Sequence, residues 1–439
     1  MNYKSVNVQK PREIAWTILS RSESEKVHAD VLLADALPRL VGPDRALCQE
    51  LVYGVIRWRA LLDWLIARRT EGRKQKPEVQ WLLRLGLYQL LWLDRVPDHA
   101  VVFEAVELTR RQGFGPQSGF VNALLRTCAR DRPALRAEIE RLRQSDPALG
   151  WSHPQWLVDR WRKRWGSDST RALLEWNNRP AETFARVNTL RTDPGQLLDR
   201  WRMEEKVAYD FVRADWLEES SMFRLESHPP LTAMGSFRDG WFYVQDPSTI
   251  LAVAALNPQP GDRILDLCAA PGGKATAIAQ RVANQALVVA RDTVPSRLDR
   301  VRENCARLGA KCVVPELTET NQAGAKTGLR FDRVLVDAPC SNTGVIRRRV
   351  ESRWGLSAEA LTRLAQTQHE LLEQGAAQLQ PGGTLVYSTC SLEPEENGAV
   401  VRRFLENRPG IELISERELW PFRDGFDGVY VAVLRHQAR

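Results

Sequence analysis

The sequence lacks any apolar run long enough to cross a membrane. No stretch of about 18 apolar residues occurs among the 439 residues, and the mean hydropathy is −0.37. The first residues, Met1-Asn2-Tyr3-Lys4, do not begin an apolar signal-peptide core. We therefore expect neither a membrane protein nor a secreted one. The apolar content of 43% and the 15 Trp exclude disorder of the whole chain.

Cysteine and histidine are scarce. The seven Cys form no C-x-x-C pair, and the six His are not paired at the spacing of metal ligands. The sequence therefore predicts neither a disulfide framework nor a metal site. An odd number of Cys in a long chain fits the reducing cytoplasm, where we expect this protein.

Lysine is rare beside arginine, with 10 Lys against 52 Arg. The formal excess of +7 lies in residues 1–145, which hold 24 basic and 17 acidic residues, while residues 146–439 hold 38 of each. The planar guanidinium group binds phosphate and stacks on bases, which favours an RNA-binding role for the first third. A GC-rich genome and a solvated basic face explain the composition equally well.

Periodicity divides the chain into three parts, which we expect to be domains of residues 1–145, 146–240 and 241–439. The first has helical patterns at 12–20, 47–69, 79–93, 101–111 and 120–128, which predict a bundle of five to seven helices. The second combines helices at 155–165, 169–177 and 196–201 with strands at 183–188, 209–212 and 241–244, typical of a small α+β module. The third alternates strands at 263–267, 286–290, 311–314, 333–336, 384–387 and 428–434 with helices such as 295–308 and 361–379, which predicts a doubly wound parallel sheet.

A glycine turn follows the first strand of that sheet, in the segment DLCAAPGGK of residues 266–274. Gly272 and Gly273 permit close approach of a ligand to the backbone, and Lys274 suits a carboxylate. Asp292 ends the next strand, where an acidic side chain binds ribose hydroxyls. No G-x-G-x-x-G is present, which argues against a dinucleotide. We expect a cofactor at this turn.

Two cysteines follow later strands. Cys340 lies in DAPCSNTG, residues 337–344, and Cys390 lies in YSTCS, residues 387–391. Two thiols beside small polar residues at the ligand edge of a sheet indicate reactive groups, whereas the other five Cys are expected to be structural. The residues alone do not decide which thiol attacks first.

At these segments the sequence resembles a known family. DLCAAPGGKA, DAPCSNTGVIRR, YSTCSLEPEEN and Gln245-Asp246-Pro247-Ser248 are similar to the motifs of the RsmB/Sun-type rRNA 5-methylcytosine methyltransferases. The resemblance covers the whole chain, and the first part resembles the NusB-like RNA-binding domain of bacterial members. It implies an all-α N-terminal bundle, a small α+β module and an α/β Rossmann-like domain that depends on S-adenosylmethionine.

The resemblance also implies roles for individual residues. It makes Cys390 the nucleophile that adds to carbon 6 of cytosine and Cys340 the helper in release. The position of Asp337 close to Cys340 in sequence favours it as the donor to ring nitrogen 3, which assists the addition. Glu316 stands where the family has an Asp that contacts the cofactor. The full set that it assigns to S-adenosylmethionine is Cys268, Ala269, Ala270, Pro271, Gly272, Gly273, Lys274, Asp292, Glu316 and Asp337.

Besides Glu316, the sequence departs from the family pattern in three further places. Arg291 precedes Asp292 where a small or apolar residue is common, and Asn342 replaces the usual Gly or Ala. Residues 349–352 read RVES where the family tends to have a Pro and an Asp. None of these departures removes a proposed catalytic group.

The prediction is a monomeric cytoplasmic enzyme that methylates carbon 5 of one cytosine in RNA, most simply in small-subunit (16S) rRNA. It needs no metal, and it takes an RNA that is single-stranded or locally unstacked at the target, because the enzyme must reach the face of the base. The alternatives are a catalytically inactive ribosome-assembly factor, a tRNA methyltransferase, and a methyltransferase of small molecules or proteins. The sequence does not identify the nucleotide.

Overall fold

The computed structural model describes residues 10–318 and 329–438. The first four residues, on which the expectation of no signal peptide rests, lie outside these ranges. The chain forms two compact units: unit 1 is residues 1–179 with 349–355, and unit 2 is residues 180–348 with 356–439. None of the described helices is long and apolar enough to span a membrane.

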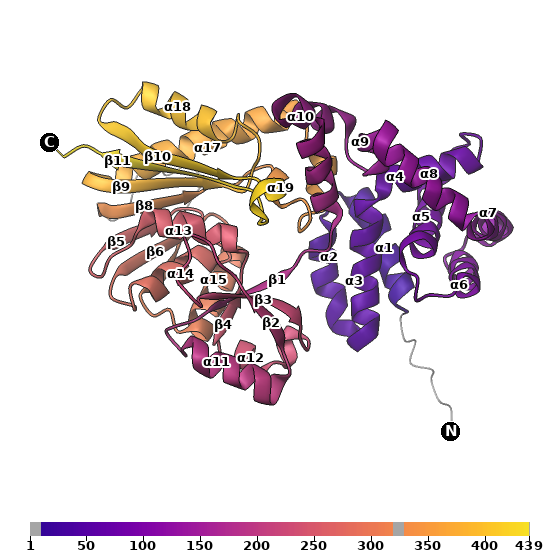
Figure 1. Ribbon diagram of the computed structural model, residues 1–439, viewed down its shortest axis with the longest axis horizontal. Coiled ribbons are helices and arrows are strands. Elements are labelled where there is room, and N and C mark those ends of the chain that lie inside the picture. Colours follow the sequence, from indigo (N-terminus) through magenta and orange to yellow (C-terminus); the bar gives the residue numbers. More distant parts are fainter. Residues whose placement is uncertain (1–9, 319–328, 439) are drawn as a thin grey trace. The chain divides into compact units, whose positions relative to one another are not determined.

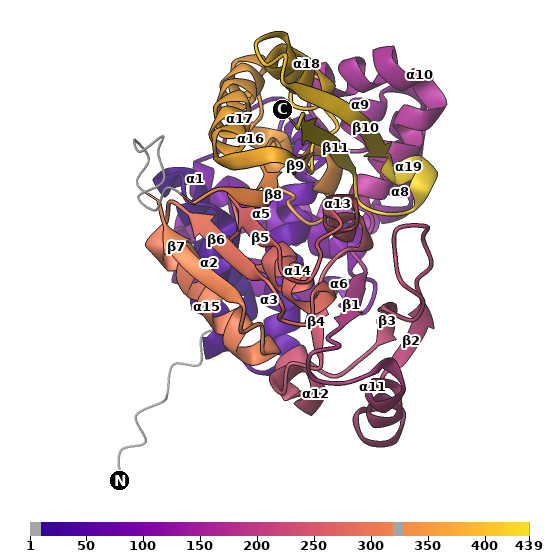
Figure 2. The same ribbon diagram turned by 90° about the vertical axis from the view of Figure 1, so that its left-hand side faces the viewer.

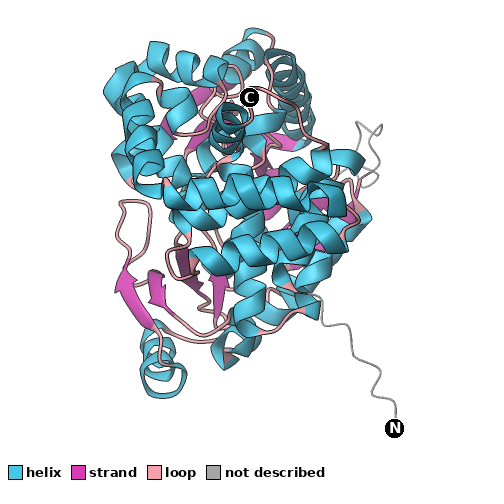
Figure 3. Cartoon of the chain, turned by 90° about the vertical axis from the view of Figure 1, so that its right-hand side faces the viewer, coloured by secondary structure: helices cyan, strands magenta, loops and turns pink. Residues whose placement is uncertain are grey.

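Unit 1 is built of helices joined by short turns (Figure 3). Several begin with a proline in the first turn, where its missing N–H costs nothing. The elements are α1 (Pro11–Glu25), α2 (Ala29–Ala36), η1 (Leu37–Arg39), α3 (Gly42–Arg57), α4 (Arg59–Arg69), α5 (Pro77–Trp92), α6 (Asp98–Arg111), η2 (Gly115–Gln117), α7 (Ser118–Arg130), α8 (Arg132–Ser145), α9 (Pro147–Gly150), α10 (Gln155–Asn178) and α16 (Ser352–Gly355).

The all-helical prediction for the first part is confirmed, with differences in detail. The expected helix at 47–69 is two helices, because the chain turns at Trp58. The sequence reading missed α2 and α8. The two helices expected at 155–165 and 169–177 form the single element α10, which is interrupted at Gly166 (φ +80°). Helix α5 is buried on nearly every face, as its apolar sequence predicts.

Residues 349–355 belong to unit 1, although the residues on both sides of them in sequence belong to unit 2. The side chain of Arg353 is fully buried there and donates to the carbonyl oxygens of Ser152 and Asn177 and to the Asn178 amide oxygen. Trp354 donates its indole N–H to the carbonyl of Ile56. This short segment is therefore part of the core of the helical unit.

Unit 2 contains two sheets. The smaller has the strand order β2-β3-β1-β4, visible at the lower right of Figure 2. Its core surrounds the buried indole of Trp201, which meets Phe223 and Phe242 edge to face. The elements are β1 (Thr183–Val187), α11 (Pro194–Arg200), η3 (Trp201–Glu205), β2 (Ala208–Phe211), β3 (Met222–Ser227), η4 (Leu231–Ala233), α12 (Gly235–Arg238) and β4 (Phe242–Val244). The sequence predicted this α+β module but missed β3.

The larger sheet has seven strands in the order β10-β11-β9-β8-β5-β6-β7. Helices α17 and α18 cover one face, and α13, α14 and α15 cover the other (Figure 1). The elements are η5 (Pro247–Thr249), α13 (Ile250–Leu256), β5 (Arg263–Asp266), α14 (Gly273–Arg281), β6 (Leu287–Asp292), α15 (Pro295–Leu308), β7 (Val313–Leu317), β8 (Phe331–Asp337), η6 (Thr343–Val345), α17 (Ala358–Gln378), β9 (Leu379–Thr389), α18 (Gly398–Glu406), β10 (Ile411–Leu419), α19 (Pro421–Asp424) and β11 (Val429–His436).

The Rossmann-like fold class is confirmed, since the five strands β5 to β9 are parallel. The prediction of a wholly parallel sheet is wrong at one edge, where β11 pairs antiparallel with β9 and β10 pairs antiparallel with β11. The sequence missed β10, because most of its side chains are exposed and give no apolar alternation. The strand order changes direction at β5: β6 and β7 follow on one side of it, and β8 and β9 lie on the other. The switch point is therefore between β5 and β8, and ligands bind at such a point in doubly wound sheets.

Candidate active site

The glycine turn follows β5 and opens α14. Gly272 has φ +99°, a conformation that residues with a Cβ rarely adopt. Arg186 of β1 fixes this turn from the smaller sheet, since it donates to the Gly273 carbonyl oxygen at 2.9 Å and to the Thr276 hydroxyl at 3.1 Å. The smaller sheet thereby positions the turn at which we predicted the cofactor.

Asp266, the last residue of β5, is fully buried, and neither of its carboxylate oxygens has a hydrogen-bond partner. Burial, and then the charge of Asp337, raise the pKa of Asp266 to about 7. An unpartnered buried carboxylate costs free energy, and the raised pKa lowers that cost by favouring the neutral form of Asp266. Asp266 is the first residue of the motif DLCAAPGGK, but the sequence analysis predicted no role for it.

Lys274 and Asp337 meet across the ends of two strands. The Lys274 ammonium donates to Oδ2 of Asp337 at 2.5 Å, and the Ser388 hydroxyl donates to Oδ1 at 2.7 Å. Burial lowers the pKa of Lys274, but the carboxylate of Asp337 raises it overall. The pair therefore places a proton donor and its carboxylate partner at the carboxyl ends of β5 and β8.

Asp292 and Glu316, both predicted to bind the cofactor, face opposite sides of the sheet. Asp292 ends β6, is buried, and accepts from the backbone N–H of Val294 at 3.1 Å. Glu316 lies beside Arg291 in the register of β6 and β7, and its carboxylate accepts from Nε of Arg291 at 3.0 Å. Because successive side chains of a strand alternate between faces, Arg291 and Glu316 lie on the face away from Asp292.

The remaining residues of the turn present mainly backbone. Ala269 is buried, Ala270 is half-buried and Pro271 is exposed. Cys268 is half-buried, and burial followed by the charge of Asp266 raises the pKa of its thiol. That thiol is therefore held protonated and is a poor nucleophile.

Cys340 and Cys390 come together, although 50 residues separate them in sequence. Their Sγ atoms are 3.0 Å apart, and both side chains are partly exposed. The hydrogen bond with Cys390, followed by burial, raises the pKa of Cys340 well above its usual value. Gly344 makes the approach possible, since a Cβ there would lie 2.8 Å from the carbonyl oxygen of Cys390.

A buried carboxylate joins the two cysteine loops. Glu396 accepts from the backbone N–H of Ser341 at 2.8 Å and from its hydroxyl, and from the Ser391 hydroxyl at 2.5 Å. Gln368 of α17 adds a further donor at 3.0 Å. Because Ser341 follows Cys340 and Ser391 follows Cys390, Glu396 fixes the spacing of the two thiols. Glu396 lies in the motif YSTCSLEPEEN, but the sequence analysis predicted no role for it.

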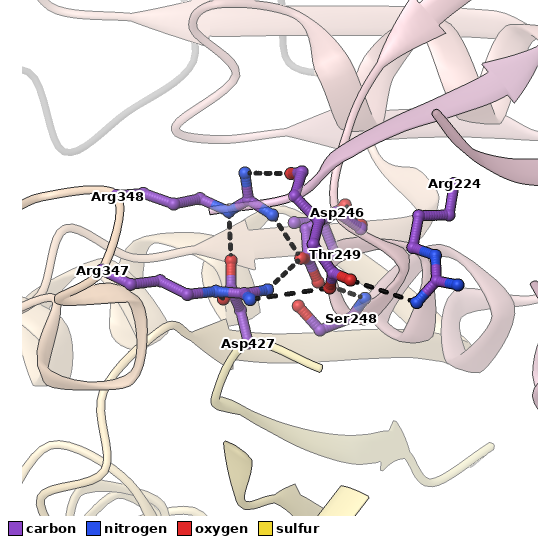
Figure 4. Close-up of polar contacts among 8 residues, drawn as sticks. Arg224, Asp246, Ser248, Thr249, Arg347, Arg348 and Asp427 are labelled. Atoms are coloured by element: carbon purple, nitrogen blue, oxygen red, sulfur yellow. Dashed lines mark hydrogen bonds and ion pairs between the residues drawn. The ribbon is translucent and has the colours of Figure 1, made fainter. Parts of the chain in front are cut away.

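An ion cluster anchors the end of the Cys340 loop (Figure 4). Asp427 accepts from Nε of Arg347 at 2.6 Å and from Nε of Arg348 at 2.5 Å, and Asp246 accepts from Arg348 at 2.8 Å. Burial alone would raise the pKa of Asp246, but Arg348 and the bonds from Ser248 lower it overall. The cluster ties the segment after Cys340 to the QDPS segment and to the start of β11.

The described residues contain no group of three or more His, Cys, Asp or Glu side chains placed to hold a metal ion. The acidic residues of the site instead pair with Lys274, Ser388 and backbone N–H groups. The arrangement suits a cationic cofactor beside two thiols.

Comparison with known families matches three parts of the chain. Residues 253–435 match the family "16S rRNA methyltransferase RsmB/F", residues 9–130 match the NusB family, and residues 153–214 match the ferredoxin-like domain of RsmF/B-like methyltransferases. These matches confirm the family resemblance and the NusB-like character of the first part.

Two curated relatives extend over most of the chain. Ribosomal RNA small subunit methyltransferase B of Escherichia coli (strain SMS-3-5 / SECEC) is 40% identical over 376 residues, covering 84% of each chain. The probable ribosomal RNA small subunit methyltransferase B of Bacillus subtilis (strain 168) is 33% identical over 406 residues, covering 91% of this chain and 89% of the relative.

Among solved structures, the crystal structure of PH0851 matches with a TM-score of 0.80 at 25% identity, over 97% of this chain and all of that one. The fold, the motif-bearing loops and the two curated relatives agree. The chain therefore belongs to the family of 16S rRNA methyltransferases RsmB/F, and its cofactor is S-adenosylmethionine.

Proposed function

We propose that this enzyme methylates carbon 5 of a cytosine in small-subunit (16S) rRNA through a covalent bond to Cys390. The observation that carries the proposal is the approach of two thiols, Cys340 and Cys390, to 3.0 Å beside the Lys274–Asp337 pair. Methylation of an amine or a carboxylate needs no thiol, whereas carbon 5 of cytosine is too weak a nucleophile to be methylated unaided.

The addition step activates the base. The Cys390 thiolate forms a bond to carbon 6, and the electrons of the carbon 5–carbon 6 double bond move toward ring nitrogen 3. We assign the proton that nitrogen 3 receives to Asp337, supplied by Lys274, because Asp337 lies three residues before Cys340 and shares the Lys274 proton. When bound, S-adenosylmethionine would supply an electrophilic methyl group on its sulfonium sulfur. Carbon 5 would accept that group, and S-adenosylhomocysteine would leave as a thioether with the electron pair of the broken carbon–sulfur bond.

Release restores the ring. The proton of carbon 5 leaves to solvent and its electron pair re-forms the double bond between carbons 5 and 6. As this happens, the bond between Sγ of Cys390 and carbon 6 breaks and its electron pair returns to sulfur. Nitrogen 3 gives its proton back to the Lys274–Asp337 pair. Cys340 assists by donating its S–H to the departing Cys390 sulfur, a role that its raised pKa and the 3.0 Å separation favour. Cys390 thus acts first and Cys340 last.

We assign the cofactor residues as the family resemblance implies. Asp292 would bind the ribose hydroxyls, and the turn of Cys268, Ala269, Ala270, Pro271, Gly272 and Gly273, with Lys274, would hold the methionine part. Asp337 would provide a further acceptor. Glu316 is paired with Arg291, and a contact with the cofactor would compete with that ion pair. We therefore assign Glu316 a weaker role in cofactor binding than Asp292.

The proposal extends to partners and location. The basic excess in residues 1–145 and the NusB match support RNA binding by that region, as a helical domain before the 146–240 module and the 241–439 catalytic domain. All seven Cys are free, as in proteins of the reducing cytoplasm. We propose a cytoplasmic monomer that binds its target cytosine unstacked.

Trapping of the covalent complex tests the mechanism. Cys340→Ala, mixed with cofactor and 16S rRNA fragments, should accumulate a protein–RNA species that survives a denaturing gel, because addition and methyl transfer proceed but release stalls. Cys390→Ala and the double variant should form none. A species formed by Cys390→Ala but not by Cys340→Ala would reverse the two roles.

Full activity of both single variants would refute the covalent mechanism. Trapping with tRNA but not with rRNA would move the substrate to tRNA. Loss of trapping in every variant, with RNA binding intact and no methylation by the wild-type enzyme, would favour an inactive assembly factor.

A further inference from the structure

The amide of Asn342 lies against both cysteines. Its Nδ2 donates to the carbonyl oxygen of Cys340 at 3.0 Å, and its Oδ1 is 3.2 Å from Sγ of Cys390. Asn342 adopts φ +61° and ψ +24°, a left-handed conformation that Asn tolerates better than most residues. The side chain therefore bridges the two loops at the reactive thiols, at a position where the sequence departs from its family.

The hydrogen-bond partners fix the orientation of this amide. A backbone carbonyl oxygen only accepts, so the NH₂ group of Asn342 must face Cys340, and its oxygen must face Cys390. An amide oxygen also only accepts, so the Cys390 thiol donates its proton to Asn342. The contact between the two thiols then runs from the Cys340 S–H to the Cys390 sulfur.

We propose that Asn342 is a positioning residue that keeps the proton on Cys390 in the resting enzyme and so raises the pH at which this thiol becomes reactive. The proposal rests on the proposed function, in which Cys390 is the nucleophile. A Gly or Ala at this position would offer no acceptor to the thiol.

Other groups act on the same pair of thiols. Cys340 lies nearest to Cys390, and Lys274 also interacts electrostatically with Cys390. Glu396 and Tyr387 interact with Cys340, and Asp337 interacts with Tyr387. The Lys274 ammonium favours a thiolate at Cys390, whereas the carboxylate of Glu396 disfavours a thiolate at Cys340. Substitution of Asn342 leaves these groups in place, so a comparison with the wild-type enzyme isolates the contribution of the amide.

Asn342→Gly is the informative variant, because Gly adopts φ +61° without strain and removes the acceptor. The rate of iodoacetamide alkylation is measured against pH in the full-length protein, and mass spectrometry of the digested protein separates Cys390 from Cys340. A hydrogen bond of ordinary strength moves the midpoint for Cys390 to lower pH by about 0.5 to 1 unit. At a pH below both midpoints the variant should react about three- to tenfold faster.

Asn257→Gly is the matched control. Asn257 is an exposed Asn with φ +47° at the end of α13, far in sequence from both cysteine loops, and its replacement should leave the Cys390 profile unchanged. Asn342→Asp provides a second arm if the Gly variant folds poorly. It keeps the shape and adds a negative charge, so it should move the midpoint to higher pH.

The pH profile separates proton affinity from access. A faster plateau at high pH with an unchanged midpoint would mean that Asn342 only covers the thiol, and it would overturn the proposal. Unchanged midpoints in both Asn342 variants would overturn it too. Alkylation needs no RNA, so these outcomes are independent of the trapping experiment. If Cys390 is the nucleophile, the single-turnover methylation rate of Asn342→Gly should shift along the pH axis in parallel with alkylation.

Discussion

Replacement of Glu396 by Ala should loosen both cysteine loops at once. The Glu396 side chain is fully buried and accepts two bonds from Ser341, one from the Ser391 hydroxyl and one from Gln368. Ala removes the acceptor and leaves the backbone N–H of Ser341 without a partner. As donors, the two serine hydroxyls keep only their contacts with each other and with Thr343, and Gln368 keeps only its bond to the Pro339 carbonyl oxygen. The loops that carry Cys340 and Cys390 then lose their shared anchor.

The magnitude follows from the number and type of bonds. A hydrogen bond to a charged group contributes about 1.5–3 kcal/mol, and an unpartnered buried donor costs about 1–3 kcal/mol. Four such bonds are not additive, because the loops relax and water enters, so we expect the free energy of local opening to fall by about 3–5 kcal/mol. Glu396→Gln keeps the shape and one acceptor oxygen, and its loss should be about 2–3 kcal/mol.

Amide hydrogen exchange measures this opening directly, in peptides that cover residues 338–345 and 388–397. Protection in both peptides should fall together, whereas peptides from β6 and β7 should be unaffected. Glu412→Gln, an exposed Glu of β10, is the control and should change neither peptide. A change below about 1 kcal/mol in Glu396→Ala, or a change in one loop alone, would refute the shared anchor.

Two further predictions concern the cofactor and the ion cluster. Asp292→Ala should weaken S-adenosylmethionine binding about tenfold or more in calorimetry with the fold intact, and an unchanged affinity would remove Asp292 from the site. Burial, and then Asp246, raise the pKa of Asp427 to about 6, so the folded protein holds a proton that the unfolded chain releases between about pH 4 and 6. The contribution of Asp427 to the unfolding free energy should fall by up to about 3 kcal/mol as pH rises through that window. Asp427→Asn should remove this fall in urea denaturation, and an identical slope would contradict the raised pKa.

The sequence predicted the architecture wherever burial leaves a periodic pattern. The parallel strands are nearly continuous apolar runs, and the helix expected at 295–308 matches α15 to the residue. The antiparallel edge was missed because β10 is largely exposed. The strand expected at 384–387 is longer in the structure, since α17 ends at Gln378 and β9 begins at Leu379.

The candidate site was predictable where motifs place residues at strand ends. Cys340, Cys390, Lys274 and Asp337 were predicted as site residues because each follows or ends a strand. The distances between them could not be predicted from the sequence. Glu396 lies 55 residues from Ser341, and its role as an anchor depends on a pairing that no local pattern contains. Asp266 was overlooked because an acidic residue at a strand end has no signature that distinguishes an unpartnered side chain from a paired one.

The contacts in the structure explain the residues that depart from the family pattern. Arg291 and Glu316, unusual separately, are neighbours across two parallel strands and form one ion pair. The RVES segment places Glu351 at the start of α2, where both of its carboxylate oxygens accept from the N–H of Ala29 at 3.0 Å. Glu351 thereby caps a helix whose own N-cap residue, His28, makes no side-chain capping bond.

Asn342 fits the same reasoning, since its amide satisfies the Cys340 carbonyl oxygen and the Cys390 thiol together. Each of these residues thus makes a hydrogen bond or ion pair with a polar group. A smaller or apolar residue at the same position could not make that bond. Arg291–Glu316 and Glu351 lie outside the pair of reactive thiols, so substitutions there should act on stability. Among these residues, Asn342 alone contacts the sulfur that we propose as the nucleophile, and its substitution should therefore change the pH dependence of the chemistry.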